Sequence, residues 1–546
     1  MRSHFIVPSL LFLTAAQPAL AYETNDNWCD RGELGVVVDR TSFEDRGFTA
    51  TESDRAVRTA LSWWSEAQAG LRFKYNSTTT SHGTGDPGPV YAACMSEDDY
   101  LTDNPSTLAY TQTYRSWHPT CDTFGLNNDE WKMVVHSDAG SASCGTRSTW
   151  AVNVNEARQN GRDVLYEVLT HEFGHVLGLD HENSIIPKPI MNSSVHDHMI
   201  ITQDDMEGVM FGLGEGVDDR QLKTVRATRS GGVLSFGAVS DLIPNRTAIW
   251  KPAVASNWNN NAPWDYVFAW VETDGRFLRL ATGRDNSSGN LVMNPVIDPG
   301  DSTLAPIAVA VGASNSIGLA WVGNDDDRTI NFKVSHDGGS TWTKTVLWGQ
   351  SAIGGVSLSY HVNMNRWVMS WLRWDDKEVQ KYRIVTVVSN GASGFSWTQT
   401  PRTYGDTLVM PNHTPVLTCE RGDTNGCLLI YRSFASADTR LVQQQAFELI
   451  NGTDDFLNAI PTTASTGDTA YSELAVAQAS WGWILTYVWP TTANDKLTYR
   501  IKGAGQGIGG SFENARNTWD GATSRSGYGV AVNRRTNAVR IVWKDN

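Results

Sequence analysis

The chain has 546 residues, too many for a single hydrophobic core, so two or three domains are expected. Hydrophobic residues make up 40% and charged residues 19%, which indicates a folded globular protein rather than a disordered one. The net charge of −15 argues against a nucleic-acid partner or an anionic membrane partner. The 22 tryptophans and 48 glycines favour β architecture with many turns.

Residues 1–21 have the three regions of a secretory signal peptide. Arg2 and His4 form a basic start, and an apolar run from Phe5 to Leu13 follows. Ala19-Leu20-Ala21 has the small residues of a cleavage site. The apolar run is too short to cross a bilayer, and no later segment is apolar enough. We therefore expect a secreted, extracellular protein without a membrane span; a buried or disordered N-terminus is the alternative.

The six cysteines suit an exported chain with disulfides. Cys419 and Cys427 flank a polar loop, and we expect them to staple a hairpin. The other four precede residue 150 and allow three pairings, which the sequence cannot separate. These four are Cys29, Cys94, Cys121 and Cys144.

The region before residue 165 predicts a strand, a helix and further strands. Leu34 to Val38 is a β-branched run typical of a central strand, and Thr51 to Gly70 has helical periodicity. Thr51 with Asp54 resembles a capping box at the start of this helix. Its expected apolar stripe consists of Val57, Ala60, Leu61, Trp64 and Ala67.

Three more strands are expected in this region. Leu71, Phe73 and Tyr75 alternate with polar residues, as in a half-buried strand. Trp131 to His136 and Thr149 to Val154 are also read as strands. Residues 76–130 are rich in Gly, Ser, Thr, Asp and Pro, and their pattern assigns no element.

Residues 171–181 carry the most informative motif, HEFGHVLGLDH. His171 and His175 are four residues apart, so a helix places both imidazoles on one face. Gly178 favours a left-handed helix end, after which the chain can return His181 as a third ligand. Three protein ligands leave one position of a tetrahedral zinc open, which is typical of catalytic sites. Glu172 is placed to reach a zinc-bound water rather than the metal.

An accidental HExxH on a solvated helix face is the alternative interpretation, but Gly178 and His181 at fixed offsets argue against it. Met191 lies ten residues after His181, in a Pro-bounded loop. Alone it would be an ordinary buried residue; after this motif it is read as a structural Met-turn.

These residues resemble the metzincins, and HEFGHVLGLDH with Ile201 to Gly208 is similar to the matrixin branch. The resemblance covers about residues 165–213. It implies an α+β catalytic domain over residues 22–214, in which an edge strand before the zinc helix lines the substrate cleft. A cysteine-switch propeptide of the PRCGxPD kind is missing, and Cys29 lacks that context. No segment clearly matches the structural zinc and calcium site of vertebrate matrixins, so a Ca²⁺ ion is an option without a placed site.

From about residue 215 helical periodicity disappears, and aromatic strands recur between polar turns. The aromatic positions are separated by 51, 50, 60, 56 and 56 residues. A period near 50 with about four strands per repeat is typical of a β-propeller. The strand that ends near Asn546 is expected to complete a blade begun around Gly232 to Ala238. The recurring positions are Trp270, Trp321, Trp371, Tyr431, Tyr487 and Trp543.

Residues 215–546 are therefore predicted to form an all-β propeller of about six blades; a pair of β-sandwiches is the alternative. Ser335 to Trp342 matches the Asp-box SxDxGxTW of sialidase-like propellers. Its Ser and Asp can bond turn backbone, its Gly permits the bend and its Trp packs inside. In that family the Asp-box is structural and implies no sialidase activity.

The sequence predicts a secreted zinc metalloendopeptidase with His171, His175 and His181 as metal ligands and Glu172 as the catalytic base. Its expected partners are protein or peptide substrates, with a protein or glycan ligand on the propeller for substrate or surface recognition. A glycosidase centred on the propeller is one alternative, since many Arg and Tyr residues are present without a motif that places them. A binding protein with a vestigial zinc domain is the other, and the complete motif counts against it.

Overall fold

The computed structural model describes two separate parts of the chain. The described residues of the N-terminal part are 33–64, 72–79, 90–93, 109–113, 131–135, 150, 165–183, 190–193, 205 and 208–209. In the C-terminal part they are residues 221–545 except 260, 273–275, 304, 324–328, 374–382, 392, 395, 398–401, 405–413, 420–425, 434–440, 450–455, 458–463, 471–472, 489–495, 507–510, 514–516 and 525–526. The predicted signal peptide, Cys29, Cys94, Cys121, Cys144 and the predicted domain boundary at 214–215 lie outside these residues.

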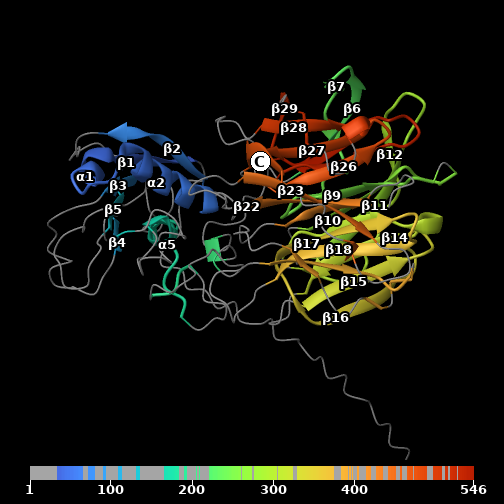
Figure 1. The fold of residues 1–546 in the computed structure, drawn as a ribbon, viewed down its shortest axis with the longest axis horizontal. Coiled ribbons are helices and arrows are strands. Elements are labelled where there is room, and N and C mark those ends of the chain that lie inside the picture. Colours follow the sequence, from blue (N-terminus) through green and yellow to red (C-terminus); the bar gives the residue numbers. More distant parts are fainter. Residues whose placement is uncertain are drawn as a thin grey trace, which may run out of the picture.

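The N-terminal part is a five-stranded sheet with helices packed against it (Figure 1). The strand order is β2-β1-β3-β5-β4, with the first four strands parallel and β4 antiparallel at the edge. The strands are β1 Glu33–Asp39, β2 Arg72–Thr79, β3 Val90–Ala93, β4 Ala109–Thr113 and β5 Trp131–Val135. The helices are α1 Arg40–Glu44, α2 Ala50–Trp64 and α5 Leu165–Val176.

Helix α2 confirms the predicted apolar stripe but begins with a different cap. Val57, Ala60, Leu61 and Trp64 are all buried. The predicted cap of Thr51 and Asp54 is wrong, because Thr49 accepts the amide hydrogen of Glu52 and the Glu52 carboxylate accepts that of Thr49. This is a capping box two residues earlier. Ala67 lies outside the described residues.

Three of the expected strands are confirmed as β1, β2 and β5. Strand β1 lies between β2 and β3, as expected of a central strand. The edge strand expected just before the motif helix cannot be checked, because residues 136–149 and 151–164 lie outside the described residues. Among the described strands, β2 and β4 lie at the two edges of the sheet, and β4, which lies in the unassigned region, contacts α5. Of the strand expected at Thr149 to Val154, only Trp150 is described; it is a bend and buried.

The C-terminal part contains six β-sheets, the blades of a propeller. Blade 1 contains β9 Ala253–Ser256, β10 Tyr266–Val271, β11 Leu278–Asp285 and β12 Leu291–Met293. Blade 2 contains β13 Ala308–Val311, β14 Ile317–Val322, β15 Thr329–Ser335 and β16 Thr343–Ser351. Blade 3 contains β17 Ile353–His361, β18 Arg366–Arg373, β19 Arg383–Val388 and β20 Arg402–Tyr404.

The other three blades complete the ring. Blade 4 contains β21 Val416–Cys419, β22 Gly426–Ser433, β23 Leu441–Leu449, β24 Phe456–Leu457 and β25 Ala464–Thr469. Blade 5 contains β26 Ala475–Ala479, β27 Gly482–Val488, β28 Lys496–Gly503 and β29 Asn517–Thr523. Blade 6 contains β30 Gly529–Val532, β31 Val539–Lys544, β6 Leu222–Ser230, β7 Val233–Phe236 and β8 Ser240–Asp241.

The ring closes through blade 6, which combines the two ends of the propeller sequence. Strand β31 pairs antiparallel with β6, with Val539 opposite Ala227 and Lys544 opposite Leu222. The innermost strands of the blades contact one another in the cyclic order β9, β13, β17, β21, β26, β30 and back to β9. The expected closure by the C-terminal strand is therefore confirmed, and the two-sandwich alternative is excluded.

Six buried apolar clusters fill the spaces between the blades. Each cluster combines residues of two successive blades, and each contains one aromatic residue of the predicted repeat. The repeat therefore reflects a large ring at an equivalent place in each seam, and aromatic burial contributes strongly to the energetics of such cores. The six residues are Trp270, Trp321, Trp371, Tyr431, Tyr487 and Trp543.

Two local predictions in the propeller are also confirmed. Cys419 and Cys427 form a disulfide across the β21–β22 hairpin. In the Asp-box turn between β15 and β16, the Ser335 hydroxyl donates to Asp337 and accepts the Gly339 amide hydrogen. Asp337 also accepts the amide and hydroxyl hydrogens of Thr341. Trp342 packs against the apolar cluster between blades 1 and 2.

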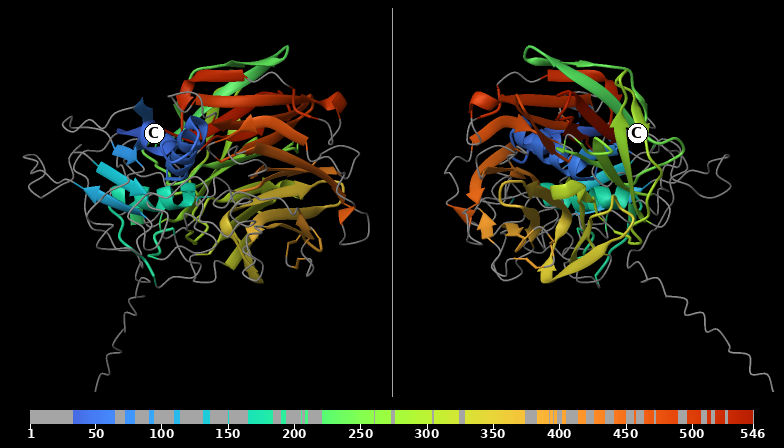
Figure 2. Two further views of the ribbon diagram at one scale, coloured as in Figure 1. Left: turned by 60° about the vertical axis from the view of Figure 1, so that its left-hand side comes forward. Right: turned by 90° about the vertical axis from the view of Figure 1, so that its right-hand side faces the viewer.

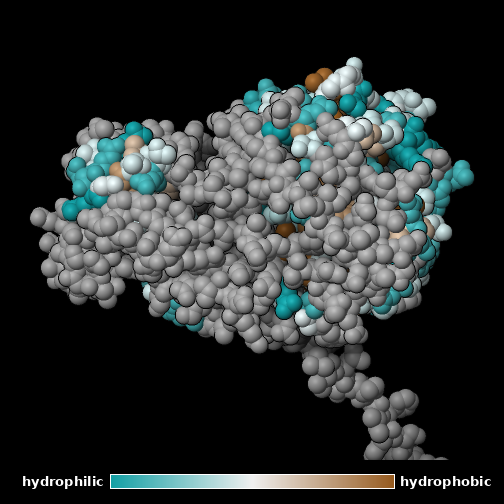
Figure 3. Space-filling model, viewed as in Figure 1, coloured by the Kyte–Doolittle hydropathy of each residue, from teal (hydrophilic) through white to brown (hydrophobic). Residues whose placement is uncertain are grey.

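The sheet domain and the propeller lie side by side, and the C-terminus is on the side of the propeller that faces the sheet domain (Figures 1 and 2). The described surface in Figure 3 is largely hydrophilic, with only small hydrophobic areas. None of the helices in the described part of the chain has the length and apolarity required to span a membrane.

Candidate metal centre

Helix α5 presents two histidines on one face. His171 and His175 are one turn apart, and their Nε2 atoms are 3.1 Å from each other. Glu172 follows His171 on the same helix and is 3% exposed. The four-residue spacing thus produces the predicted convergence of two imidazoles.

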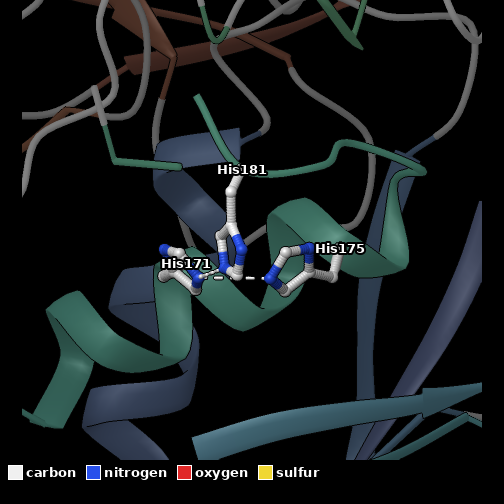
Figure 4. Close-up of side chains that lie close together, drawn as sticks. All are labelled: His171, His175 and His181. Carbon is white, nitrogen blue, oxygen red and sulfur yellow. Dashed lines mark hydrogen bonds between the residues drawn. The ribbon is translucent and has the colours of Figure 1, made fainter. Parts of the chain in front are cut away.

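The third histidine is brought back by the end of this helix. Gly178 has a φ of 90°, the Leu179 amide donates to the Gly174 carbonyl, and the Gly178 amide donates to the His175 carbonyl. These bonds form a Schellman motif, which favours glycine at its left-handed position. His181 then lies above the helix, with its Nε2 3.2 Å from that of His171 (Figure 4). The candidate ligand atoms of the three residues all lie within 4.8 Å of one another.

Two of the imidazoles are oriented by backbone carbonyls. Nδ1 of His171 lies 2.6 Å from the Ile190 carbonyl oxygen, and Nδ1 of His175 lies 2.8 Å from that of Leu179. A carbonyl only accepts, so each Nδ1 carries the hydrogen and each Nε2 presents a lone pair inward. Burial lowers the pKa of His175 to about 4, although its bond to Leu179 opposes the shift. Burial also lowers the pKa of His181.

Neutral imidazoles with converging lone pairs repel one another unless a cation lies between them. For a tetrahedral zinc with Zn–N bonds of about 2.0–2.1 Å, neighbouring nitrogens are about 3.3–3.4 Å apart. Nε2 of His171 lies 3.1 Å from that of His175 and 3.2 Å from that of His181, close to this spacing. The residues present therefore fit a zinc ion.

The segment containing Met191 supports the helix from below. Ile190 and Met191 form a turn, and both are buried. Met191 packs against Gly174, and the Trp64 indole donates to the carbonyl of Thr170, just before His171. The Asp205 carboxylate, 2% exposed, accepts the amide hydrogens of both Ile190 and Met191. Because the Ile190 carbonyl also orients His171, Asp205 is linked to the first histidine through this turn.

Comparison with known families agrees with this geometry. The model of the matrixin peptidase family matches residues 28–211. The N-terminal domain is matrixin-like. It is followed by a six-bladed propeller, so the chain combines a metallopeptidase domain with a separate all-β domain.

Solved structures with loose overall similarity include three lectins. The SapL1 lectin, in complex with alpha methyl fucoside, is 15% identical with a TM-score of 0.36, covering 52% of this chain and 85% of that chain. The Aleuria aurantia lectin AAL is 15% identical with a TM-score of 0.36, covering 52% and 84%. The BP39L lectin from Burkholderia pseudomallei is 12% identical with a TM-score of 0.36, covering 55% and 81%. Overlaps this loose say nothing about what the propeller of this chain binds.

The structure brings together the predicted residues of the matrixin-like domain. His171, His175 and His181 converge, Glu172 is buried on the same helix, and Met191 lies beneath. Sequence reasoning gave Asp205 no role in the site. The local sequence Asp204-Asp205 does not indicate a hydrogen bond to the distant residues 190 and 191. His196 and His198 had no assigned role and lie outside the described residues.

Proposed function

We propose that this chain is a secreted zinc endopeptidase that hydrolyses peptide bonds with Glu172 as its general base. One observation carries the proposal: three imidazole Nε2 atoms converge at the spacing of zinc ligands, beside a buried carboxylate that belongs to the same helix. The matrixin family match supports the peptidase class. Secretion rests on the signal-like residues 1–21.

Each residue then has a defined role. His171, His175 and His181 would hold the zinc ion, which supplies Lewis acidity that polarises the scissile carbonyl and acidifies water. Glu172 takes a proton from the attacking water and passes it to the leaving amine. The Ile190 and Leu179 carbonyls keep Nδ1 of His171 and His175 protonated, which leaves the Nε2 lone pairs directed inward.

Peptide substrates would bind along the edge of the sheet. Strand β4 lies at one edge of the described sheet and contacts α5, which carries the first two histidines. An extended peptide can pair with such an edge, so backbone bonds give affinity with little demand on sequence. The propeller would bind a second part of the substrate or a surface, a protein or a glycan, and so raise the effective substrate concentration.

The histidines are the one group of His, Cys, Asp or Glu residues in the described part of the chain that could hold a metal ion. The proposal needs only zinc.

The test compares Glu172→Gln with the wild type and with Glu167→Gln, a matched change on the same helix. Zinc content is measured by elemental analysis and peptidase activity by casein cleavage with and without a chelator. We expect Glu172→Gln to keep zinc but lose activity by a factor of about 10²–10⁴, whereas Glu167→Gln keeps both. Full activity in Glu172→Gln would refute the role of Glu172, and chelator-resistant activity would refute a metallopeptidase.

A further inference from the structure

His181 differs from the other two histidines in how it is held. It is exposed, and in the described part of the chain its Nδ1 has no hydrogen-bond partner, whereas Nδ1 of His171 and His175 each face a carbonyl. It also follows the helix rather than belonging to it. Some other part of the structure must therefore fix its position.

The residues after His181 run beside the segment that contains Met191. The Glu182 amide donates to the Met191 carbonyl, and the Asn192 side chain donates to the Glu182 carbonyl. One step further along, the Asn183 side-chain oxygen accepts two hydrogen bonds from Ser193, from its amide and from its hydroxyl, each 2.9 Å long. We name this last pair of bonds the Asn183–Ser193 clasp.

We propose that Asn183 is a positioning residue for the metal site, which holds His181 in place through the Asn183–Ser193 clasp. This inference rests on the proposed zinc site. The segment after His181 is otherwise attached to residues 191–193 by the two bonds of Glu182. Residues 191–193 are themselves anchored, because Asp205 accepts the amide hydrogen of Met191. The clasp therefore ties the third ligand to the segment, residues 190–193, that orients the first.

The clasp needs only an acceptor oxygen at position 183, so a conservative substitution can preserve it. Asn183 only accepts in this arrangement, and both hydrogens arrive at one oxygen. Aspartate offers the same acceptor geometry, so Asn183→Asp should preserve the clasp, whereas Asn183→Ala removes it. Ser193→Ala removes the hydroxyl bond and leaves the amide bond.

The experiment measures Zn²⁺ affinity by competition with a chromophoric chelator, using the full chain. Groups that orient metal ligands typically change metal affinity by about 10–100-fold when removed. We expect about a tenfold weaker Zn²⁺ affinity for Asn183→Ala, a smaller loss for Ser193→Ala and near wild-type affinity for Asn183→Asp. Asn286→Ala is the matched control, because exposed Asn286 also accepts two amide hydrogens, from Ser288 and Asn290, far along the chain from the site.

The outcomes separate this inference from the proposed function. If the wild type binds no Zn²⁺, the proposed function fails and the inference with it. If the wild type binds Zn²⁺ and Asn183→Ala binds equally well, only the inference is overturned. Equal losses in Asn183→Ala and Asn183→Asp would also overturn it, because the acceptor oxygen would then not be the cause. Should Asn183→Ala fail to fold, Ser193→Ala tests the hydroxyl bond of the clasp, and an unchanged affinity in that variant contradicts the expected loss and overturns the inference.

Discussion

The sulfur of Met191 occupies the space next to Gly174 where any other residue would carry a side chain. A Cβ built on Gly174 would lie 2.2 Å from Met191 Sδ and 2.8 Å from Trp64 Cζ2. All three residues are buried. The glycine in HEFGH is therefore required by close packing between α5, α2 and the Met191 turn.

Gly174→Ala should destabilise the matrixin-like domain despite the higher helix propensity of alanine. Overpacking a buried site typically costs about 1–3 kcal/mol, and the propensity gain of about 1 kcal/mol offsets only part of it. Thermal unfolding followed by calorimetry measures the change. Gly505→Ala is the control, because nothing lies within 4 Å of a Cβ there. The double variant Gly174→Ala/Met191→Ala should lose less stability than the sum of the two single losses, and strict additivity would contradict direct packing.

Asp205→Asn should weaken both domain stability and Zn²⁺ affinity. Asparagine has one acceptor oxygen, so either the Ile190 or the Met191 amide is left buried beside an NH₂ group. An unsatisfied buried donor costs about 1–3 kcal/mol. Because the Ile190 carbonyl orients His171, a displaced turn also disturbs the first ligand. Denaturant unfolding and chelator competition measure the two effects, with Asp520→Asn, at an exposed carboxylate, as control. Unchanged values in Asp205→Asn would remove Asp205 from the site.

The features of the fold and the site that could be predicted from the sequence are those that follow from local spacing and periodicity. Four-residue spacing forces His171 and His175 together, and the left-handed Gly178 ends the helix where the motif expects it. The recurring aromatic residues revealed the propeller because each fills one seam between blades.

The errors arose where two local patterns compete or where the partner is distant in sequence. Thr49 with Glu52 and Thr51 with Asp54 both fit a capping box, and only the folded helix start separates them. Strand order is a long-range property, so β4 could not be recognised as an edge strand. The bonds of Asp205 and Asn183 join residues whose side chains carry no periodic signal.

A buried ionic network lies at the seam between blades 6 and 1, and the stability of the propeller should be sensitive to the loss of one of its charges. Arg540 of β31 is paired with Asp285 of β11, and both side chains are less than 5% exposed, at 3% and 4%. The Tyr266 hydroxyl donates to the same carboxylate, at 3.0 Å. This seam, beside the blade that closes the ring, is thus held by charge as well as by its apolar cluster.

Arg540→Met should destabilise the propeller strongly, because Asp285 would remain buried without its main countercharge. Removing one partner of a buried pair typically costs about 3–5 kcal/mol. Lys496→Met is the matched control, since Lys496 pairs with Asp520, whose side chain is 73% exposed, and exposed pairs contribute only about 0–1 kcal/mol. Urea unfolding of both variants provides the comparison. Equal effects would show that burial of the Arg540–Asp285 pair does not matter.

The Asp-box turn predicts a pH-dependent contribution to stability. Hydrogen bonds from Thr341, through its hydroxyl and its amide, and from the Ser335 hydroxyl hold the pKa of Asp337 far below its usual range. A carboxylate whose pKa is depressed by folding stabilises the fold above its unfolded pKa of about 3.9, and this contribution is lost as the pH falls toward the folded value. Asp337→Asn removes the charge, so the difference in stability between wild type and variant should be largest at neutral pH.

That difference should stay constant from pH 7 to about pH 5 and shrink progressively below about pH 4, where Asp337 is protonated in the unfolded wild-type chain but still charged in the folded one. Denaturant unfolding of both proteins at several pH values measures it, and the subtraction removes the effects of the other carboxylates that titrate in both. Ser340→Ala is the control within the same turn, because its hydroxyl donates to the Asp337 carbonyl and leaves the carboxylate bonds in place. A gap between wild type and Asp337→Asn that persists unchanged at pH 2 would show that the turn depends on the shape of the side chain at 337 and not on its charge.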